Sequence, residues 1–325
     1  MQLLSKHLSR IAVTLIPLLF ALMHASGVLP IGVLQRLDDI IYDARLRATM
    51  PQTIDKRIVI VDIDEKSLAE FGRWPWSRNK LAKLVDELFE RQKAALLGFD
   101  LVFAEEDDSS GLKTLKLLAQ NELRDQAGFT EKLAQIQTTL DYDALFAKSI
   151  EARPVVMGYY LTSDRDGGVS GVLPAPVMAA DSLGGRPIRF TSWNGFGANI
   201  ELLAKAAPVS GFFNSITEGD GVVRSIPLLA EYRGQYYESL SLAIFRMLAG
   251  SPKVKPGFPQ EKFLSQSYQG LESILLLQAG KTLAIPVDHR VATLVPFRGN
   301  GAVDGGSFRY VSAADLLGKC IARGN

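Results

Sequence analysis

Apolar and polar residues along the chain follow two alternating patterns, which together are typical of an α/β domain. Apolar, β-branched runs long enough for buried strands occupy 57–64, 94–103 and 154–161. Between the first two runs, residues 79–92 place apolar side chains on one face at helical spacing, and 143–151 predicts a further short helix. We therefore predict a mostly parallel central sheet with flanking helices, in which the first two strands are parallel neighbours.

The remaining segments of the chain are less regular. Residues 112–140 form a more polar helical insertion interrupted at Gly128, and 164–185 is rich in Gly, Asp and Pro. Residues 209–216 and 222–232 predict an antiparallel hairpin section, joined by the turn residues 218–221. Further elements are predicted as an apolar helix at 239–248, strands at 273–278, 281–287 and 292–297, and a short helix from Ser312.

The N-terminal segment is strongly apolar. No Asp, Glu, Lys or Arg lies between Arg10 and Arg36, so residues 11–34 are long enough to cross a hydrocarbon core of roughly 30 Å. Basic residues precede this segment and acidic residues follow it, which places the N-terminus in the cytoplasm. A cleaved signal peptide and a buried core helix are the alternatives. The predicted order is a cytoplasmic N-terminus at 1–10, a transmembrane helix at 11–35 and an extracytoplasmic domain at 36–325.

Composition excludes several classes of protein. The 325 residues carry a formal charge of +1, which argues against a nucleic-acid partner, because binding to phosphates needs a basic face. The single cysteine, Cys320, allows no intramolecular disulfide and no thiolate zinc cluster. The three histidines are scattered along the sequence. We therefore expect no metal site and no cofactor.

Acidic residues follow the first predicted strand. Asp62 and Asp64 stand two residues apart after an apolar run, and this resembles the start of a haloacid-dehalogenase-type phosphohydrolase. Lys66 stands where that family has Thr or Val. The alternative is structural: Asp64 or Glu65 caps the next helical turn and Asp62 binds loop amides.

An aromatic turn comes directly after these acids. Trp74, Pro75 and Trp76 form a stiff apolar plate between Arg73 and Arg78. The rings either pack on the core or make a ligand or dimer contact. Because ligands bind open α/β sheets at the carboxyl ends of strands, we predict a ligand-binding rim. Its residues would be Asp62, Asp64, Arg73, Trp74, Trp76, Arg78 and Asp100.

Two further motifs have plain explanations. Residues 219–224, Gly-Asp-Gly-Val-Val-Arg, lack the Lys-Ser/Thr of a P-loop, and a hairpin turn accounts for them. Leu34, Leu37 and Ile41 form a stripe that either packs on the core or makes a dimer seam. No Ser/His/Asp arrangement is readable in the sequence, so we predict no catalytic residue.

Several of these motifs, taken in order, resemble the second type of CHASE domain. The resemblance rests on Tyr42-Asp43-x-Arg45, the strand 57–68, and the Gly72 to Arg78 turn. It continues along the chain with Gly98-Phe99-Asp100-x-x-Phe103, the 219–224 motif and Tyr310-Val311-Ser312. The resemblance covers most of the chain.

The resemblance implies a non-catalytic, extracellular sensory module of a bacterial transmembrane receptor, located at the inner membrane and facing the periplasm. Its output would be a class III adenylate or guanylate cyclase, or else a histidine or Ser/Thr kinase. Its partners would be an unknown small-molecule or peptide signal, the membrane and a second copy of the chain. The chain ends at Asn325, before the later membrane helices that the resemblance calls for, so we expect a piece of a longer receptor. A membrane-anchored, Mg-dependent phosphohydrolase using Asp62 and Asp64 is the alternative function.

Overall fold

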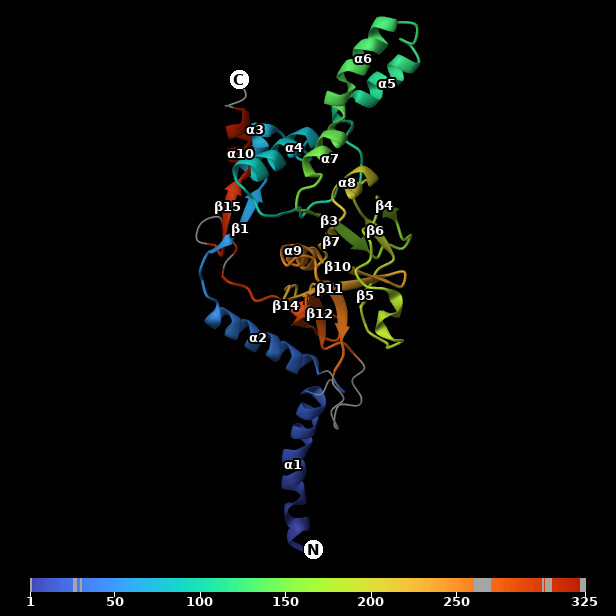
Figure 1. Cartoon of the computed structure of the whole chain (residues 1–325). Helices are drawn as coiled ribbons and strands as arrows, with labels where there is room; N and C mark the ends of the chain where they lie inside the picture. The colour runs from blue at the N-terminus through green and yellow to red at the C-terminus, as the bar shows by residue number, and fades with distance from the viewer. Residues whose placement is uncertain are drawn as a thin grey trace. The chain divides into compact units, whose positions relative to one another are not determined.

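The computed structural model describes most of the chain. The described residues are 2–25, 28–29, 31–259, 270–299, 301 and 306–321. The chain divides into two compact units, of which the first comprises 1–60 and 296–309 and the second 61–295 and 310–325. The result is a mixed α/β protein with several small sheets (Figure 1).

The first unit is mainly helical. Helix α1 spans Gln2–Ala25 and helix α2 spans Gly32–Thr49. Helix α2 ends before Pro51, since the residue before a proline disfavours helical dihedrals. Strand β1 (Asp55–Asp62) begins in this unit and pairs with β15 (Phe308–Ser312) in a two-stranded sheet.

The predicted membrane segment is not a single helix. Helix α1 stops at Ala25 and α2 starts at Gly32, so the predicted range 11–35 includes parts of two helices. Among the described residues, no helix combines the length and the apolar character that a membrane crossing requires.

The second unit opens with helices around one short strand. Its elements up to β3 are α3 (Glu65–Phe71), α4 (Arg78–Asp86), a π turn (Glu87–Arg91), β2 (Leu97–Gly98), a 3₁₀ turn (Asp108–Ser110), α5 (Leu112–Gln120), α6 (Ala127–Leu140), α7 (Tyr142–Ile150) and β3 (Val155–Thr162). The helical insertion is a hairpin of α5 and α6 that projects from the unit (Figure 1). Its break lies at residues 121–126 rather than at Gly128.

Strand β3 is the centre of the main sheet. Its order is β2-β3-β6-β4, with β7 also paired to β3. Strands β2 and β7 run parallel to β3, and β6 runs antiparallel. The remaining members are β4 (Val169–Ser170), β6 (Gly195–Gly197) and β7 (Ser210–Phe212).

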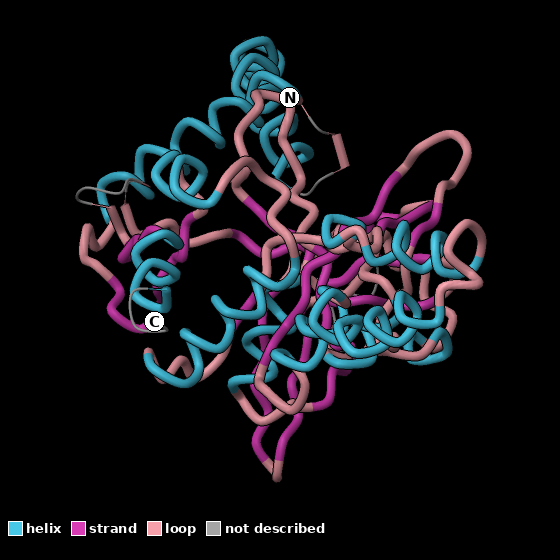
Figure 2. The backbone as a smooth tube through the Cα atoms, turned by 90° about the horizontal axis from the view of Figure 1, so that it is seen from above, coloured by secondary structure: helices cyan, strands magenta, loops and turns pink. Residues whose placement is uncertain are grey.

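The other strands form separate small ladders (Figure 2). They are β5, β9 and β10 (Thr191–Ser192, Leu229–Tyr232, Gln235–Glu238), β8 and β14 (Ser225–Pro227, Ala292–Leu294), and β11 to β13 (Lys253–Gly257, Ser273–Gln278, Lys281–Pro286). The helical elements here are a 3₁₀ turn (Ala180–Leu183), α8 (Glu201–Ala206), α9 (Leu240–Leu248) and α10 (Ala313–Ile321).

Two predicted pairings are wrong. Strand β1 pairs with β15 and is not a neighbour of β2, because β2 joins the other sheet through β3. The segments 209–216 and 222–232 do not form a hairpin: β7 pairs with β3, β8 with β14 and β9 with β10. The turn at 218–221 is present, since Gly221 N donates to Glu218 O at 2.9 Å. The sequence therefore predicted the local turn correctly, but it did not predict which distant strands pair.

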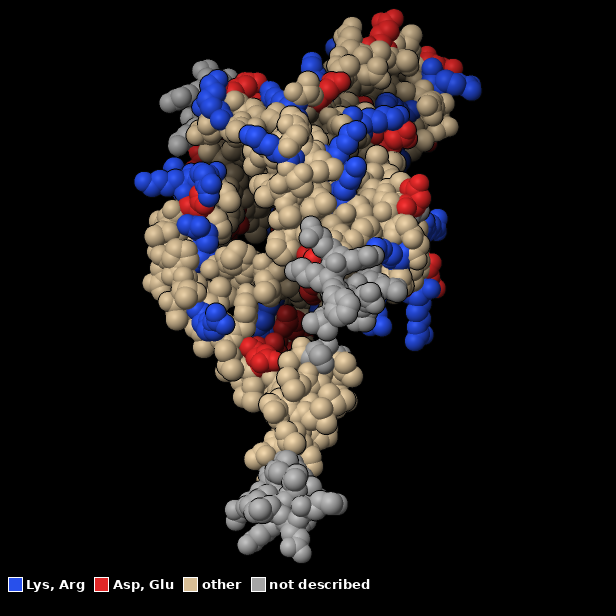
Figure 3. Space-filling model, turned by 60° about the horizontal axis from the view of Figure 1, so that its bottom comes forward, with Lys and Arg blue, Asp and Glu red and all other residues tan. Residues whose placement is uncertain are grey.

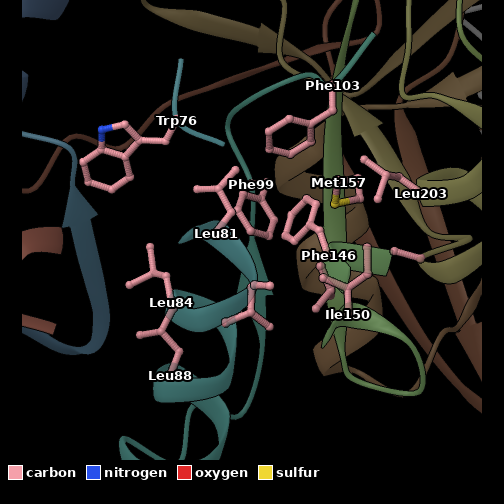
Figure 4. Close-up of a cluster of buried hydrophobic side chains, with 14 of the residues drawn as sticks. Trp76, Leu81, Leu84, Leu88, Phe99, Phe103, Phe146, Ile150, Met157 and Leu203 are labelled. Atoms are coloured by element: carbon pink, nitrogen blue, oxygen red, sulfur yellow. The ribbon is translucent and has the colours of Figure 1, made fainter. Parts of the chain in front are cut away.

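The largest core cluster lies between α4, α7 and β3. The apolar face of α4 is buried as predicted, and three phenylalanines, Phe99, Phe103 and Phe146, meet edge to face with ring centroids 5.2 to 5.8 Å apart (Figure 4). Such edge-to-face contacts add to the stabilisation from burial. This cluster packs against α4 and the loop after β2, and that loop lines the cavity described next.

Candidate ligand-binding site

Asp64 has a structural task at the N-terminus of α3. Its Oδ1 accepts hydrogen bonds from Ser67 N at 2.9 Å, Ser67 Oγ at 2.7 Å and Ser312 Oγ at 2.8 Å. The hydrogen bonds from Ser67, with a smaller one from Ser312, hold the pKa of Asp64 below its usual value. The prediction that Asp64 caps the following helix is confirmed. Through Ser312, the same carboxylate also contacts the residue directly before α10.

The two tryptophans of the aromatic turn have different environments. Trp76 is 2% exposed, and its Nε1 donates to Gly72 O at 2.8 Å. Its ring contacts Phe71 and Trp74 at centroid distances of 5.8 and 6.4 Å. Trp74 is 38% exposed and precedes a cis peptide bond to Pro75. Trp76 is therefore core, and the surface-accessible ring of the pair is Trp74.

Arg78 is buried at the start of α4. Its guanidinium lies over the ring of Phe103, 4.4 Å from the centroid, and Nη2 donates to Glu105 O at 3.3 Å. Its Nε lies 3.6 Å from Asp143 Oδ1, which is ion-pair distance but not a hydrogen bond. Burial lowers the pKa of Arg78, and the carboxylates of Asp143 and Asp107 act in the opposite direction.

Asp107 and Asp143 complete a buried charged cluster with Arg78. Asp107 Oδ2 accepts from Arg78 N at 2.6 Å, and Asp107 N donates to Asp143 Oδ2 at 2.8 Å. Burial raises the pKa of Asp143, only partly offset by the hydrogen bond from Asp107 and the charge of Arg78. Burial also acts to raise the pKa of Asp107, but hydrogen bonds from Ser109 and Arg78 outweigh it, so that pKa is lowered. Two neighbouring carboxyl groups thus differ in their affinity for protons.

This cluster forms part of the wall of a cavity of about 560 Å³. The cavity is bounded by the loop after β2, the facing ends of α5 and α6, the start of α7 and the start of α8. A volume of this size suits a small metabolite. Its charged lining residues are Glu106, Asp107, Asp108, Asp141, Asp143, Glu201, Lys113, Lys116 and Lys205.

The structure disperses most of the predicted rim. Asp62 is the last residue of β1, whereas Asp100 is exposed and follows β2 in a different sheet, so the two do not share an edge. Arg73 is exposed on the aromatic turn. Arg78 alone among the predicted residues contacts residues that line the cavity. In the described part of the chain, no group of three His, Cys, Asp or Glu residues is placed to hold a metal ion.

Sequence reasoning did not select Asp107 or Asp143. Asp107 comes at the end of an apolar run and Asp143 at the start of a helix, and both positions favour acidic residues for structural reasons alone. The two are 36 residues apart, with the α5–α6 hairpin between them. The one feature of the sequence that could have indicated this pair is the presence of acidic residues on both sides of the α5–α6 hairpin.

The surface carries charges of both signs. On the face in Figure 3, Lys and Arg side chains are interspersed with Asp and Glu, without one large basic patch. This distribution agrees with the near-neutral formal charge.

Comparison with known proteins gives one match. No curated protein and no solved structure matches the chain. The family model of the CHASE2 domain matches residues 13–324, which is nearly the whole chain. The chain therefore belongs to the CHASE2 family of extracellular sensory domains found in signalling receptors.

Proposed function

We propose that the chain is the non-catalytic input module of a bacterial transmembrane receptor and that the cavity beside Asp143 receives its signal. The observation that carries this proposal is a metabolite-sized cavity with a buried charged cluster in its wall, in a chain of a sensory family. Ligand binding there would favour one arrangement of α4 and α7 over another. A ligand shifts such an equilibrium only by its difference in affinity for the two states.

The proposed output is a class III adenylate or guanylate cyclase, with a histidine or Ser/Thr kinase as the alternative. Support comes from the family alone. The test measures cyclic nucleotide formation by the parent receptor carrying Asp143→Asn. The control is Glu131→Gln, at an exposed position of α6. A changed response only in Asp143→Asn supports the proposal. Equal responses would place the sensing site elsewhere.

The proposed location is the inner membrane, with residues after 35 on the periplasmic side. The support is the uncharged segment between Arg10 and Arg36 and the basic residues before it. A phosphatase reporter that is active only outside the cytoplasm, fused after Asn325, should be active. A matched fusion after Arg10 should be inactive. The reverse pair of results would contradict this orientation.

A phosphohydrolase is the less favoured function. Its second acid, Asp64, accepts three hydrogen bonds at one oxygen and caps α3. A residue held in this way is poorly placed to transfer protons. A Mg²⁺-dependent phosphatase assay on the chain, with Asp62→Asn as control, is expected to show no activity that depends on Asp62.

A second copy of the chain is the proposed protein partner. Helix α2 has no buried residue, and its stripe of Leu34, Leu37 and Ile41 has the spacing of a coiled-coil seam. Packing of two such stripes would bring two sensory domains together. A ligand that favours one arrangement of the pair could then act on the output.

A further inference from the structure

Glu238 is a buried acid that the candidate ligand-binding site does not use. It is the last residue of β10 and is 5% exposed, and Ser239 directly after it caps α9. Its Oε1 accepts a hydrogen bond from Arg246 Nη1 in the last turn of α9. Its Oε2 is buried and has no hydrogen-bond partner among the described residues. The carboxylate is therefore only half satisfied, which is costly for a buried ionised group.

Arg246 extends this contact to a third segment of the chain. Its Nε donates to Pro252 O at 3.0 Å, and Pro252 is the residue directly before β11. The side chain of Arg246 is 17% exposed, against 5% for that of Glu238. One guanidinium group therefore joins the end of β10, the last turn of α9 and the start of β11. We call Glu238, Arg246 and Pro252 together the Glu238 junction.

The surroundings of Glu238 make Arg246 its electrostatic partner. The elements packed beside it carry further ionisable groups: Tyr159 and Tyr160 on β3, Glu231 and Tyr232 on β9, Tyr236 and Tyr237 on β10 itself, and the exposed Lys253 and Lys255 on β11. Strand β7 carries none. Tyr159 is fully buried, and burial together with the charges of Tyr237 and Glu238 raises its pKa. Among all these groups, Arg246 is the one whose charge acts on Glu238.

Protonation of Glu238 would act on this contact in one direction. Burial raises the pKa of Glu238, and the hydrogen bond and charge of Arg246 only partly offset that rise. The long stem of Arg246 allows its guanidinium to turn into water, and the offset is then lost. Glu238 therefore binds a proton more tightly in this open form than in the closed one, so a fall in pH favours opening. It also binds a proton more tightly than an unfolded Glu with a pKa of 4.5, so its protonation does not itself unfold the domain.

We propose that the Glu238 junction is an acid-sensitive switch, which is closed while Glu238 is ionised and is opened by its protonation. Opening frees the last turn of α9 from the start of β11. The inference goes beyond the proposed binding of a signal in the cavity, because no residue of the junction lines that cavity. A proton that favours the open form shifts the populations of the two forms as a ligand does.

The experiment is hydrogen exchange of the full chain in detergent at pH 7.5 and at pH 5, followed by mass spectrometry and corrected for the intrinsic effect of pH on exchange. The segment 247–254 reports opening, since it includes the hydrogen bond from Ser251 N to Arg246 O and the first pairs of β11 with β12. We expect its protection to fall about tenfold or more at pH 5, because a charge-assisted hydrogen bond is lost. Strand β3, which is largely buried, is the internal reference and should keep its protection.

A matched pair of variants assigns the response to Glu238. Glu238→Gln keeps the shape of the side chain and removes its titration, so the segment 247–254 should be weakly protected at both pH values and change by less than about twofold between them. Glu272→Gln, at an exposed position directly before β12, should respond to pH as the unmodified chain does. Circular dichroism melting verifies that each variant is folded, and the response of the unmodified chain can be interpreted without either variant.

Three results would overturn the proposal. The first is equal protection of the segment 247–254 at the two pH values in the unmodified chain. The second is a loss of protection at pH 5 that β3 shares, since this is global unfolding and not local opening. The third is a pH response that Glu238→Gln retains, which would assign it to another acid, such as Asp143, whose pKa is also raised by burial. These measurements use no ligand and no output domain, so a failure leaves the proposed sensory function standing.

Discussion

Ser312 Oγ donates a hydrogen bond of 2.8 Å to Asp64 Oδ1 and so joins parts of the chain that are 248 residues apart. Ser67 Oγ, which is buried, donates to the same oxygen at 2.7 Å and accepts from Ala314 N at 3.0 Å. Lys66 and Asp315 form an ion pair beside this network. The cap of α3 and the first turn of α10 are therefore one hydrogen-bonded unit.

Loss of the Ser67 hydroxyl should destabilise the fold. Ser67→Ala removes a donor to Asp64 and an acceptor for the buried Ala314 N–H, so we expect the free energy of unfolding to fall by about 1–3 kcal/mol. Exposed Ser170→Ala is the control and should change it by less than about 0.5 kcal/mol. Urea denaturation measures both. If the two substitutions lower the free energy of unfolding equally, the hydrogen-bond network around Ser67 does not stabilise the fold.

The two tryptophans of the turn offer a matched pair. Trp76→Ala removes a side chain that is 2% exposed and should cost about 3–5 kcal/mol. Trp74→Ala, two residues away and 38% exposed, should cost less than half as much. Thermal melting followed by circular dichroism compares them. If both variants melt at the temperature of the unmodified chain, the burial of Trp76 in solution differs from that described.

Helices and strands were predicted from the sequence more accurately than the pairing of strands in the sheets. The apolar face of α4 and the apolar helix predicted at 239–248 are set by spacing and local chemistry, and both are present, the latter as α9. The sheet is different, because β1 and β2 carry equally apolar runs and nothing local indicates that β15 pairs with β1. Partner choice depends on contacts that are remote in sequence.

The same limit applies to the candidate site. Arg78 was selected because it follows a strand end and an aromatic turn, and it does contact the cavity wall. Its partner Asp143 lies beyond the α5–α6 hairpin, so the pair depends on the packing of α4 against α7. Asp64 and Trp76 were also selected from the sequence; in the structure Asp64 caps α3 and the ring of Trp76 is buried.

The pair of Arg78 and Asp143 should show strong coupling. Arg78→Met leaves buried Asp143 without its counter-charge, so we expect a loss of about 3–5 kcal/mol in unfolding free energy. Adding Asp143→Leu should restore part of that loss, because no uncompensated buried charge remains. Exposed Arg73→Met is the control and should be nearly neutral. Strictly additive effects in the double variant would contradict the coupling.

The turn at 218–221 should contribute to acid sensitivity. Arg224 pairs with Asp220 Oδ2 at 2.7 Å, and hydrogen bonds from Arg224 and Val222 lower the pKa of Asp220 from 3.8 to about 2. A lowered folded-state pKa means stabilisation that is present above the unfolded value and is lost as pH falls towards 2. Asp220→Asn should therefore flatten the fall in stability between pH 4 and pH 2. Melting temperatures across this range test it, and an unchanged slope would contradict the pairing.

The last prediction concerns the stripe on α2. A charge placed in a helix–helix seam must be desolvated against apolar side chains, whereas the same charge on the outer face stays in water. We expect Leu37→Glu and Ile41→Glu to weaken self-association of the full chain in detergent by at least about tenfold. Gln35→Glu adds the same charge to the same helix off the stripe and should leave self-association unchanged. Sedimentation equilibrium gives the association constants. If the unmodified chain is monomeric, the proposed dimer is wrong. If all three substitutions weaken self-association equally, the added negative charge, and not its position on the stripe, controls association.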